Sequence, residues 1–336
     1  IFLSGYYPAL ALLNRKPITL LKGKFLNSKS GEGTRKVLVV VQYTASMILL
    51  CGTLIVFAQL NFMRNQSLGV KTDQTLVVKF PGRTEGMNTK LEAMKKAIAR
   101  LPLVDKVTFS GAVPGEEVAT FLSNRRKSDA LKQNRLYEML VCDPDYIDAY
   151  GLQLVAGRGF SEDYGDDVNK LVVNESAVRN LGIASNEEAL GEEIEVECTD
   201  APMQIIGVVK DYHQQALNKN YTPIMLIHKD KIGWLPQRYI SIVMKSGDPK
   251  ELVSQVEEIW HRYFEDSSYD FFFLDQFFDH QYRQDEVFGV MIGCFTGLAI
   301  FISCLGLWVL VMFSCTTRTK EMGIRKVLGA TRWNLF

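Results

Sequence analysis

The chain has 336 residues, of which 47% are apolar and 23% are charged, a composition that excludes a largely disordered protein. Its 38 basic and 38 acidic residues cancel, but they are segregated along the sequence. No Asp, Glu, Lys or Arg occurs from Val37 to Met63 or from Val287 to Thr317. Each segment exceeds the roughly 20 apolar residues that a helix needs to cross a bilayer, so a purely soluble protein is disfavoured.

The apolar residues 1–13 are too short to span a bilayer alone. A signal peptide would need a basic leader and a small-residue cleavage site, and this sequence shows neither. We therefore interpret residues 1–13 as the end of a truncated transmembrane helix and expect the chain to be an internal fragment that continues in both directions.

Short basic segments flank the two apolar segments. Residues 14–36 carry a net charge of +6 and residues 318–336 carry +4, whereas residues 64–286 carry −10. Short basic flanks stay in the cytoplasm, while a long domain is translocated whatever its charge. The sequence therefore predicts transmembrane helices at 37–63 and 287–317, with residues 64–286 on the far side of the membrane. The alternative is a soluble protein with two buried core helices.

The second span has glycines at four-residue spacing, which places small residues on one helical face. Gly289, Gly293 and Gly297 predict close packing against another transmembrane helix. The alternative is that glycine is simply common in membrane helices.

Two stretches of the exported segment predict β-α-β units, residues 71–113 and residues 234–274. Asp248, Pro249 and Glu251 mark the start of the second helix as its cap, its first-turn proline and an acid three residues on. Two such units predict a split, ferredoxin-like α/β subdomain. Its strands are expected at 76–80, 104–109, 239–244 and 269–274.

Residues 114–233 are rich in turn residues and predict an inserted, mostly β subdomain. Residues 275–286 are predicted to form a helical stalk that runs into the second span. The predicted fold class is therefore α+β: two transmembrane helices flank an extracytoplasmic domain made of the α/β and the mostly β subdomains. Short strands of the insertion are expected at 170–173, 193–197 and 204–209.

The sequence lacks the motifs of common catalytic sites. It has no G-x-x-x-x-G-K-[ST] loop, no G-x-S-x-G elbow and no H-E-x-x-H motif, and its four histidines are scattered. Asp211, Tyr212 and His213 follow a predicted strand, so we interpret them as a turn rather than as an acid–base site. We expect no enzyme activity, no catalytic or metal site and no cofactor in this chain.

An acidic cluster and a pair of cysteines are candidates for a calcium site and a disulfide. Asp163, Asp166 and Asp167 lack the EF-hand spacing with its closing glutamate, so they predict a solvated loop. Cys142 and Cys198 are the two cysteines of the exported segment, and an oxidising compartment would allow a disulfide between them. Whether they pair is left open, because the sequence does not give their separation.

The segment after the second span has a basic, amphipathic pattern. Ile324, Val327 and Leu328 share one helical face, the basic residues lie elsewhere, and Gly329 would end the helix. Physics alone predicts a short helix on the cytoplasmic membrane surface, whose simplest role is anchoring to anionic lipid.

Residues 320–331, KEMGIRKVLGAT, resemble the cytoplasmic signature of FtsX-type permease domains in ABC transporters of the MacB class. Residues 173–178 and 206–213 resemble motifs in the exported core domain of those permeases. Residues 6–10 and 20–24 resemble the end of a preceding permease half. The resemblance covers essentially the whole chain. It implies a tandem-half permease of the kind found in Bacteroidetes-like bacteria, with multiple spans in the bacterial inner membrane and residues 64–286 in the periplasm.

The resemblance also implies a function and its partners. A cytoplasmic ABC ATP-binding subunit would hold ATP and Mg, and its closure would move the periplasmic domain through the stalk, a mechanism called mechanotransmission, for export or efflux. The other implied partners are a periplasmic adaptor, an outer-membrane channel, membrane lipids and a second permease half or copy in a dimeric or pseudo-dimeric assembly; no nucleic acid is expected. The implied coupling helix comprises Lys320, Glu321, Gly323, Ile324, Arg325, Val327, Leu328 and Gly329.

Two alternatives to the export function remain open at this point. Two spans around an exported α/β domain also describe a membrane sensor or receptor with an extracytoplasmic ligand-binding domain. A non-transporting FtsX-like regulator of cell-wall hydrolases would use the same mechanics. The sequence names neither the cargo nor the adaptor and channel.

Overall fold

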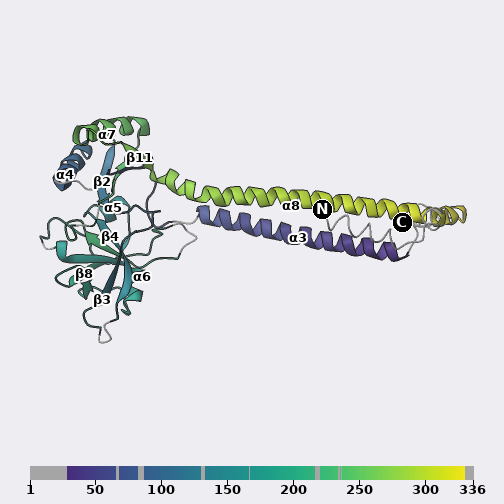
Figure 1. Cartoon of the computed structure of the whole chain (residues 1–336), viewed down its shortest axis with the longest axis horizontal. Coiled ribbons are helices and arrows are strands. Elements are labelled where there is room, and N and C mark those ends of the chain that lie inside the picture. The colour runs from purple at the N-terminus through teal and green to yellow at the C-terminus, as the bar shows by residue number, and fades with distance from the viewer. Residues whose placement is uncertain are drawn as a thin grey trace. The chain divides into compact units, whose positions relative to one another are not determined.

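The computed structural model describes residues 29–65, 68–81, 87–129, 133–165, 167–215, 220–233, 235 and 237–329 (Figure 1). The chain divides into two compact units, one of which comprises Met63–Gln284 and the other the segments before and after it. The predicted helix end at 1–13, the first part of the predicted linker and residues 330–336 lie outside the described residues.

The helices are α3 (Lys29–Asn65), α4 (Met87–Ile98), α5 (Tyr146–Ala149), α6 (Glu175–Asn180), α7 (Pro249–Tyr263) and α8 (Leu274–Val327), with a short 3₁₀ helix η2 (Asp167–Asn169). The strands of the first half are β1 (Thr75–Lys79), β2 (Val104–Ser110), β3 (Phe121–Arg126), β4 (Arg135–Cys142) and β5 (Leu154–Gly157). The strands of the second half are β6 (Lys170–Asn174), β7 (Glu193–Val196), β8 (Met203–Val209), β9 (Ile224–His228), β10 (Tyr239–Met244) and β11 (Asp270–Phe273).

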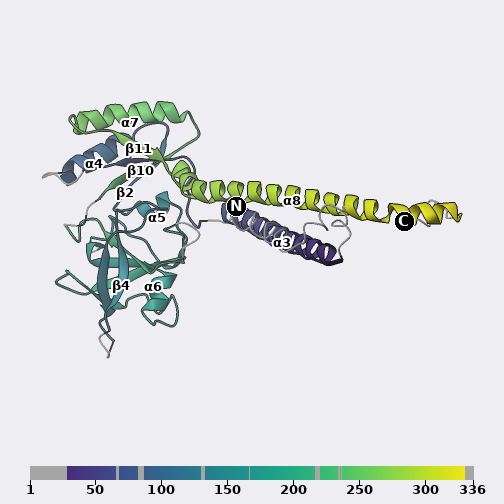
Figure 2. The same ribbon diagram turned by 45° about the vertical axis from the view of Figure 1, so that its right-hand side comes forward.

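The two predicted β-α-β units form one antiparallel sheet in the order β11-β1-β10-β2. This order interleaves the units as in a split, ferredoxin-like fold. Helices α4 and α7 lie side by side over one face of the sheet, as Figure 2 shows, and bury Met94 and Trp260 against it. The side chain of Asp248 caps α7 by accepting a hydrogen bond from the N–H of Lys250 at 3.0 Å. The predicted α/β fold is confirmed.

The inserted region is a closed β-barrel. Strand β4 pairs with β3, and the pairing continues through β7, β8, β6 and β9 back to β4. The barrel is filled by alternate residues of its strands, such as Leu171 and Val173, whereas Val172 between them packs outside the barrel. The predicted β subdomain is thus present, with β3, β4, β5 and β9 in addition to the strands expected from the sequence.

The acidic loop differs from its prediction at Asp167, while Asp163 is exposed as expected and Asp166 lies outside the described residues. The carboxylate of Asp167 is buried and forms a two-pronged ion pair with Arg158, with N–O distances of 2.6 and 2.7 Å. The guanidinium of Arg158 lowers the pKa of this carboxyl below its usual value. The prediction of a solvated loop is therefore wrong for Asp167, because Arg158 gives it a partner that a sequence pattern does not reveal.

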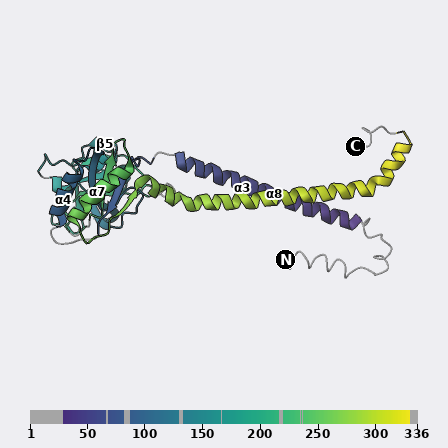
Figure 3. The same ribbon diagram turned by 90° about the horizontal axis from the view of Figure 1, so that it is seen from above.

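The other unit contains two helices that are long and apolar enough to cross a membrane. The candidate spans are Val37–Met63 in α3 and Glu286–Thr316 in α8. Helix α3 begins at Lys29, within the segment predicted as a linker, so the described part of that basic segment is helical. The two helices cross in the view of Figure 3.

Candidate functional site

Hydroxyl groups join the two membrane helices. The Ser46 and Ser303 hydroxyl oxygens lie 2.6 Å apart, and the Thr53 and Thr296 hydroxyl oxygens also lie 2.6 Å apart. Hydrogen bonds of this kind between membrane helices contribute on average about 0.6 kcal/mol each. These hydrogen bonds set the register of α3 against α8. Leucine and valine side chains contribute less to the register, because lipid chains are as apolar as they are.

The three glycines of the predicted packing face lie differently. A Cβ atom added to Gly289 would lie 3.0 Å from Leu60, and one added to Gly293 would lie 3.7 Å from Phe57. Gly297 has no such neighbour within 4 Å among the described residues. The first two glycines therefore lie along α3, while Gly297 faces open space.

The C-terminal end of α8 carries the predicted coupling segment. Helix α8 ends at Val327, and Gly329 adopts a positive φ of 90°, a conformation that ends helices and that glycine tolerates best. The side chains of Ile324, Val327 and Leu328 are 62%, 89% and 80% exposed. Gly323 and Arg325 are exposed as well, and the side chains of Lys320 and Glu321 lie outside the described set. Docking on an ATPase stays a prediction.

The first turn of α8 lies in the core of the Met63–Gln284 domain. Leu274 is fully buried, Phe278 is 4% exposed, and Phe277 packs against the same cluster of buried residues. These three positions share one face of the helix, at the i, i+3, i+4 spacing. One uninterrupted helix therefore contains the domain core at its start, a candidate span in its middle and the basic segment at its end.

The two motifs that resemble family signatures meet in space. Asp211 follows β8, and its carboxylate accepts hydrogen bonds from the N–H and the hydroxyl of Ser176 on α6, both at 2.8 Å. Its backbone N–H donates to Glu175 at 3.1 Å. His213 is 8% exposed, and burial lowers its pKa. The contacts of Asp211 with α6 agree with its interpretation as a structural turn.

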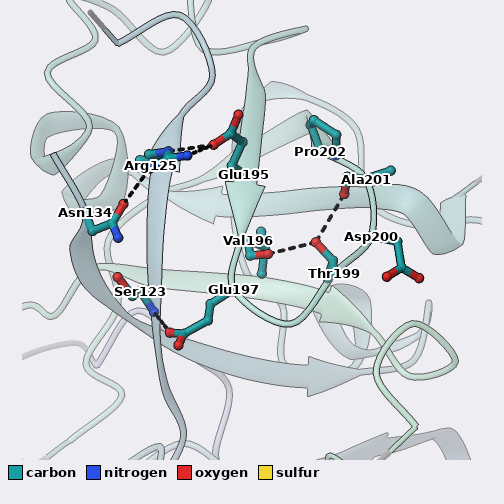
Figure 4. Close-up of a pocket in the computed structure, with 10 residues that line it drawn as sticks. All are labelled: Ser123, Arg125, Asn134, Glu195, Val196, Glu197, Thr199, Asp200, Ala201 and Pro202. Atoms are coloured by element: carbon teal, nitrogen blue, oxygen red, sulfur yellow. Dashed lines mark hydrogen bonds and ion pairs between the residues drawn. The ribbon is translucent and has the colours of Figure 1, made fainter. Parts of the chain in front are cut away.

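A polar cleft of about 410 Å³ lies beside β3 and β7 (Figure 4). Arg125 donates to Glu195 at 2.5 Å, and Glu197 accepts from the N–H of Ser123 at 2.9 Å. Thr199 donates to two backbone carbonyls of the same loop. These contacts pair several of the lining groups with one another, and within the described residues the lining contains no buried polar atom without a partner. The cleft therefore gives no reason to assign it a ligand.

The remaining candidate groups form no site in the described part of the chain. No cluster of three or more His, Cys, Asp or Glu residues could hold a metal ion there. Cys142 is buried and Cys198 is exposed, and both are free thiols. The question of a disulfide is thus answered in this structure by two unpaired cysteines.

A buried carboxyl makes the stability of the Met63–Gln284 domain depend on pH. Glu138 is 3% exposed, and burial raises its pKa to about 7. Below its unfolded pKa the group is protonated in both states. As the pH rises, the unfolded chain ionises first, so the folded state loses stability up to about pH 7, by about 3 kcal/mol in total. Glu138→Gln is expected to be more stable than the wild type at pH 8 and similar at pH 4.5.

The measurement is urea denaturation of residues 63–284 at both pH values. The matched control is Glu193→Gln, which removes a half-exposed carboxylate of the same domain that pairs with Lys127 at the surface. The control should change little at either pH. A Glu138→Gln variant that gains no stability at high pH would contradict the raised pKa.

Comparisons with known proteins agree with this architecture. The family described as the MacB-like periplasmic core domain matches residues 44–259, and the FtsX-like permease C-terminal family matches residues 293–336. The uncharacterized ABC transporter permease YvrN of Bacillus subtilis is 22% identical over 210 residues, covering 56% of this chain and 49% of that protein. The macrolide export ATP-binding/permease protein MacB of Aggregatibacter actinomycetemcomitans is 26% identical over 203 residues, covering 56% of this chain and 30% of that protein.

Among solved structures, the periplasmic region of MacB from Actinobacillus actinomycetemcomitans is similar, with 17% identity and a TM-score of 0.43, covering 64% of this chain and 94% of that one. The chain spans half or less of the length of the two curated relatives described above.

Two candidate membrane helices around a MacB-like domain define a permease-type membrane protein with a periplasmic segment. The chain belongs to the MacB/FtsX-type ABC transporter permease family, because the periplasmic core family alone matches more than half of its residues. The match of residues 293–336 to the permease C-terminal family also disfavours the sensor alternative, in which a signalling helix or kinase would follow the second span.

Proposed function

We propose that this chain is the permease part of an ABC transporter of the bacterial inner membrane that works by mechanotransmission. A cytoplasmic ATP-binding subunit binds ATP and Mg and docks on the end of α8. Its closure moves α8, and α8 moves the periplasmic domain to drive export or efflux. The chain itself performs no catalysis.

The observation that carries this proposal is the continuity of α8. The helix has 54 residues, which corresponds to a length of about 80 Å. An unbroken helix resists bending because each turn is held by backbone hydrogen bonds, so it is suited to pass a displacement from one end to the other. The start of the helix is buried in the domain core, at Leu274 and Phe278, which prevents this end from sliding independently of the domain.

The C-terminal end of α8 has features expected of a docking site for a protein partner. Ile324, Val327 and Leu328 form an exposed apolar face beyond the candidate span Glu286–Thr316. An amphipathic helix that presents such a face is a common mode of docking into an apolar groove of a partner. The names of several relatives combine export, ATP-binding and permease functions, which supports an ATP-binding subunit as that partner.

The experiment is a pull-down of the tagged full-length protein from native membranes, with the bound proteins identified by mass spectrometry. Recovery of an ATP-binding subunit is the expected result. A periplasmic adaptor or an outer-membrane channel recovered with it would support export, whereas an activator of cell-wall hydrolases would support the regulatory alternative. If no ATP-binding subunit is recovered and the full-length chain contains none, the proposed function is wrong.

A further inference from the structure

A glycine of the β2–β3 connection lies directly on the two aromatic rings at the base of α8. A Cβ atom on Gly115 would lie 2.9 Å from Phe278 and 3.1 Å from Phe277. Contacts below 3.0 Å do not occur at real Cβ atoms, so any larger residue must displace the rings or the loop. Gly115 also has a φ of 93°, which other residues rarely adopt. Both observations show that this loop is shaped to seat the first turn of α8.

Gln214 holds this loop in place. Its side-chain N–H groups donate to the carbonyl oxygens of Val113 at 2.8 Å and Glu116 at 3.0 Å, and its backbone carbonyl oxygen accepts from the N–H of Gly115 at 2.8 Å. Gln214 is 2% exposed. The buried side-chain amide therefore holds the loop with two hydrogen bonds, and the backbone of the same residue adds a third. Losing the amide would leave two buried carbonyl oxygens without these donors, so Gln214 shapes the loop.

The residues just before Gln214 hold the segment that follows α3. The N–H of His213 donates to the carbonyl oxygen of Leu68 at 2.9 Å. Gly69 packs on Tyr212, since a Cβ atom on Gly69 would lie 3.2 Å from the Cβ of Tyr212. Leu68 itself packs against the same buried cluster as Phe277. The short connector Asp211–Gln214 therefore contacts both places where the chain passes between the domain and a candidate span.

The same connector is anchored to the barrel. It follows β8 directly, and the carboxylate of Asp211 binds Ser176 and also accepts from Arg179 at 2.5 Å. Helix α6, which carries these partners, follows β6 of the barrel and is capped by Asn174. The side chain of Asp211 is 8% exposed and its bonds to Ser176 are partly buried, whereas the Arg179 side chain is 63% exposed. The bonds to Ser176 therefore contribute most to holding the connector on α6.

We propose that Asp211–Gln214 is a joint that fixes the barrel to the first turn of α8 and to the segment after α3. This proposal rests on the proposed function, because a joint of this kind passes the movement of α8 to the barrel. Gln214 and Gly115 are its positioning residues: Gln214 shapes the loop, and Gly115 lets the rings of Phe277 and Phe278 approach the backbone. The joint also explains why two sequence motifs far apart in the chain meet at Asp211.

The test uses the full-length permease with its ATP-binding subunit in lipid nanodiscs. A donor dye is attached at Leu136→Cys, an exposed position of the barrel, after the exposed cysteines have been replaced by serine. Energy transfer to acceptor-labelled lipids is measured with and without ATP and Mg, together with the ATPase rate. Gln214→Leu is expected to reduce the ATP-dependent change about fivefold or more while the ATPase rate is kept.

The matched control is Gln204→Leu, the same substitution at a barrel glutamine that donates to the carbonyl of Gly191. Gln204→Leu should retain the ATP-dependent change in energy transfer, even if it lowers the thermal stability as much as Gln214→Leu does. Gly115→Ala should reduce the ATP-dependent change in energy transfer as Gln214→Leu does. Adding Phe278→Leu to Gly115→Ala should restore part of that change, because the smaller side chain makes room for the new Cβ atom. If Gln214→Leu does not fold, Phe277→Leu replaces it in the comparison.

A Gln214→Leu complex that responds to ATP like the wild type would overturn the joint and leave the proposed function intact. A wild-type complex with an active ATPase but no change in energy transfer would overturn the proposed function, and the joint with it. Equal losses in Gln214→Leu and Gln204→Leu would show a general loss of structure and would also count against the joint.

Discussion

Replacing Ile324 and Leu328 together by aspartate is expected to reduce the ATP-binding subunit recovered with the permease at least about tenfold. Burial of one such side chain contributes about 1.5–3 kcal/mol, and about 1.4 kcal/mol corresponds to a tenfold change in affinity. Losing both apolar side chains should therefore lower the affinity for the ATP-binding subunit more than tenfold, even if each is only partly buried. The measurement is the amount of ATP-binding subunit per permease after affinity purification, with the ATPase rate of the purified complex as a second readout.

The control for this variant is Thr319→Asp, which adds a charge to the same exposed part of α8. At 100° per residue Thr319 lies about 140° around the helix from Ile324, on the other side from the apolar face. This variant should keep the subunit. Full recovery with both aspartates at 324 and 328 would show that the apolar face does not dock on the ATPase, and anchoring to lipid would become its better explanation.

Replacing Asp143 by alanine is expected to destabilise the periplasmic domain by about 3 kcal/mol. The side chain is fully buried and binds the ammonium of Lys95 at 2.5 Å, the hydroxyl of Thr108 at 2.5 Å and the N–H of Phe109 at 3.0 Å. Breaking a buried ion pair by removing one partner costs about 3–5 kcal/mol. We expect a cost at the lower end of this range, because the ammonium of Lys95 retains its second partner, Asp145. The measurement is urea denaturation of residues 63–284 at pH 7.

Two comparisons separate the buried pair from a general effect of losing an aspartate. Asp148→Ala removes an exposed carboxylate that pairs with Lys106 at the surface, and it should cost less than about 1 kcal/mol. Lys95→Met combined with Asp143→Ala should be less destabilising than the sum of the single changes, because no buried charge is then left without its partner. Equal effects of the two aspartate variants would contradict the importance of the buried pair.

Local sequence patterns were sufficient to predict the helices and strands of the α/β part of the periplasmic domain. The cap at Asp248, the proline after it and the apolar spacing of α7 all lie within one segment, and the helix begins there. The strand expected at 239–244 has the same bounds as β10. These signals depend on neighbours in the sequence, which is why they could be recognised without the fold.

The barrel was predicted less completely for a physical reason. Strand β4 pairs in parallel with β9, and its partner lies far along the chain. Strand β3 carries polar residues such as Asn124 and Arg125, and these find their partners only after β7 is placed beside it. Neither strand shows a clean alternation that stands out from its surroundings. Closure of the barrel is a property of long-range pairing, so the sequence pattern did not reveal it.

The sequence by itself determined two candidate spans, the charge asymmetry of their flanks, the elements of the two β-α-β units and the family signatures. All of these depend on composition or on residues within one turn or strand of each other. Only the tertiary structure decided that Asp167 pairs with Arg158, that the inserted strands close into a barrel and that Asp211–Gln214 contacts both Gly115 and Leu68. The barrel pairings and the contacts of Asp211–Gln214 join residues far apart in the chain, and the Arg158–Asp167 pair joins residues nine positions apart across a loop. All of them are decided by how the elements pack, because the periodicity of a helix or strand does not bring these residues together.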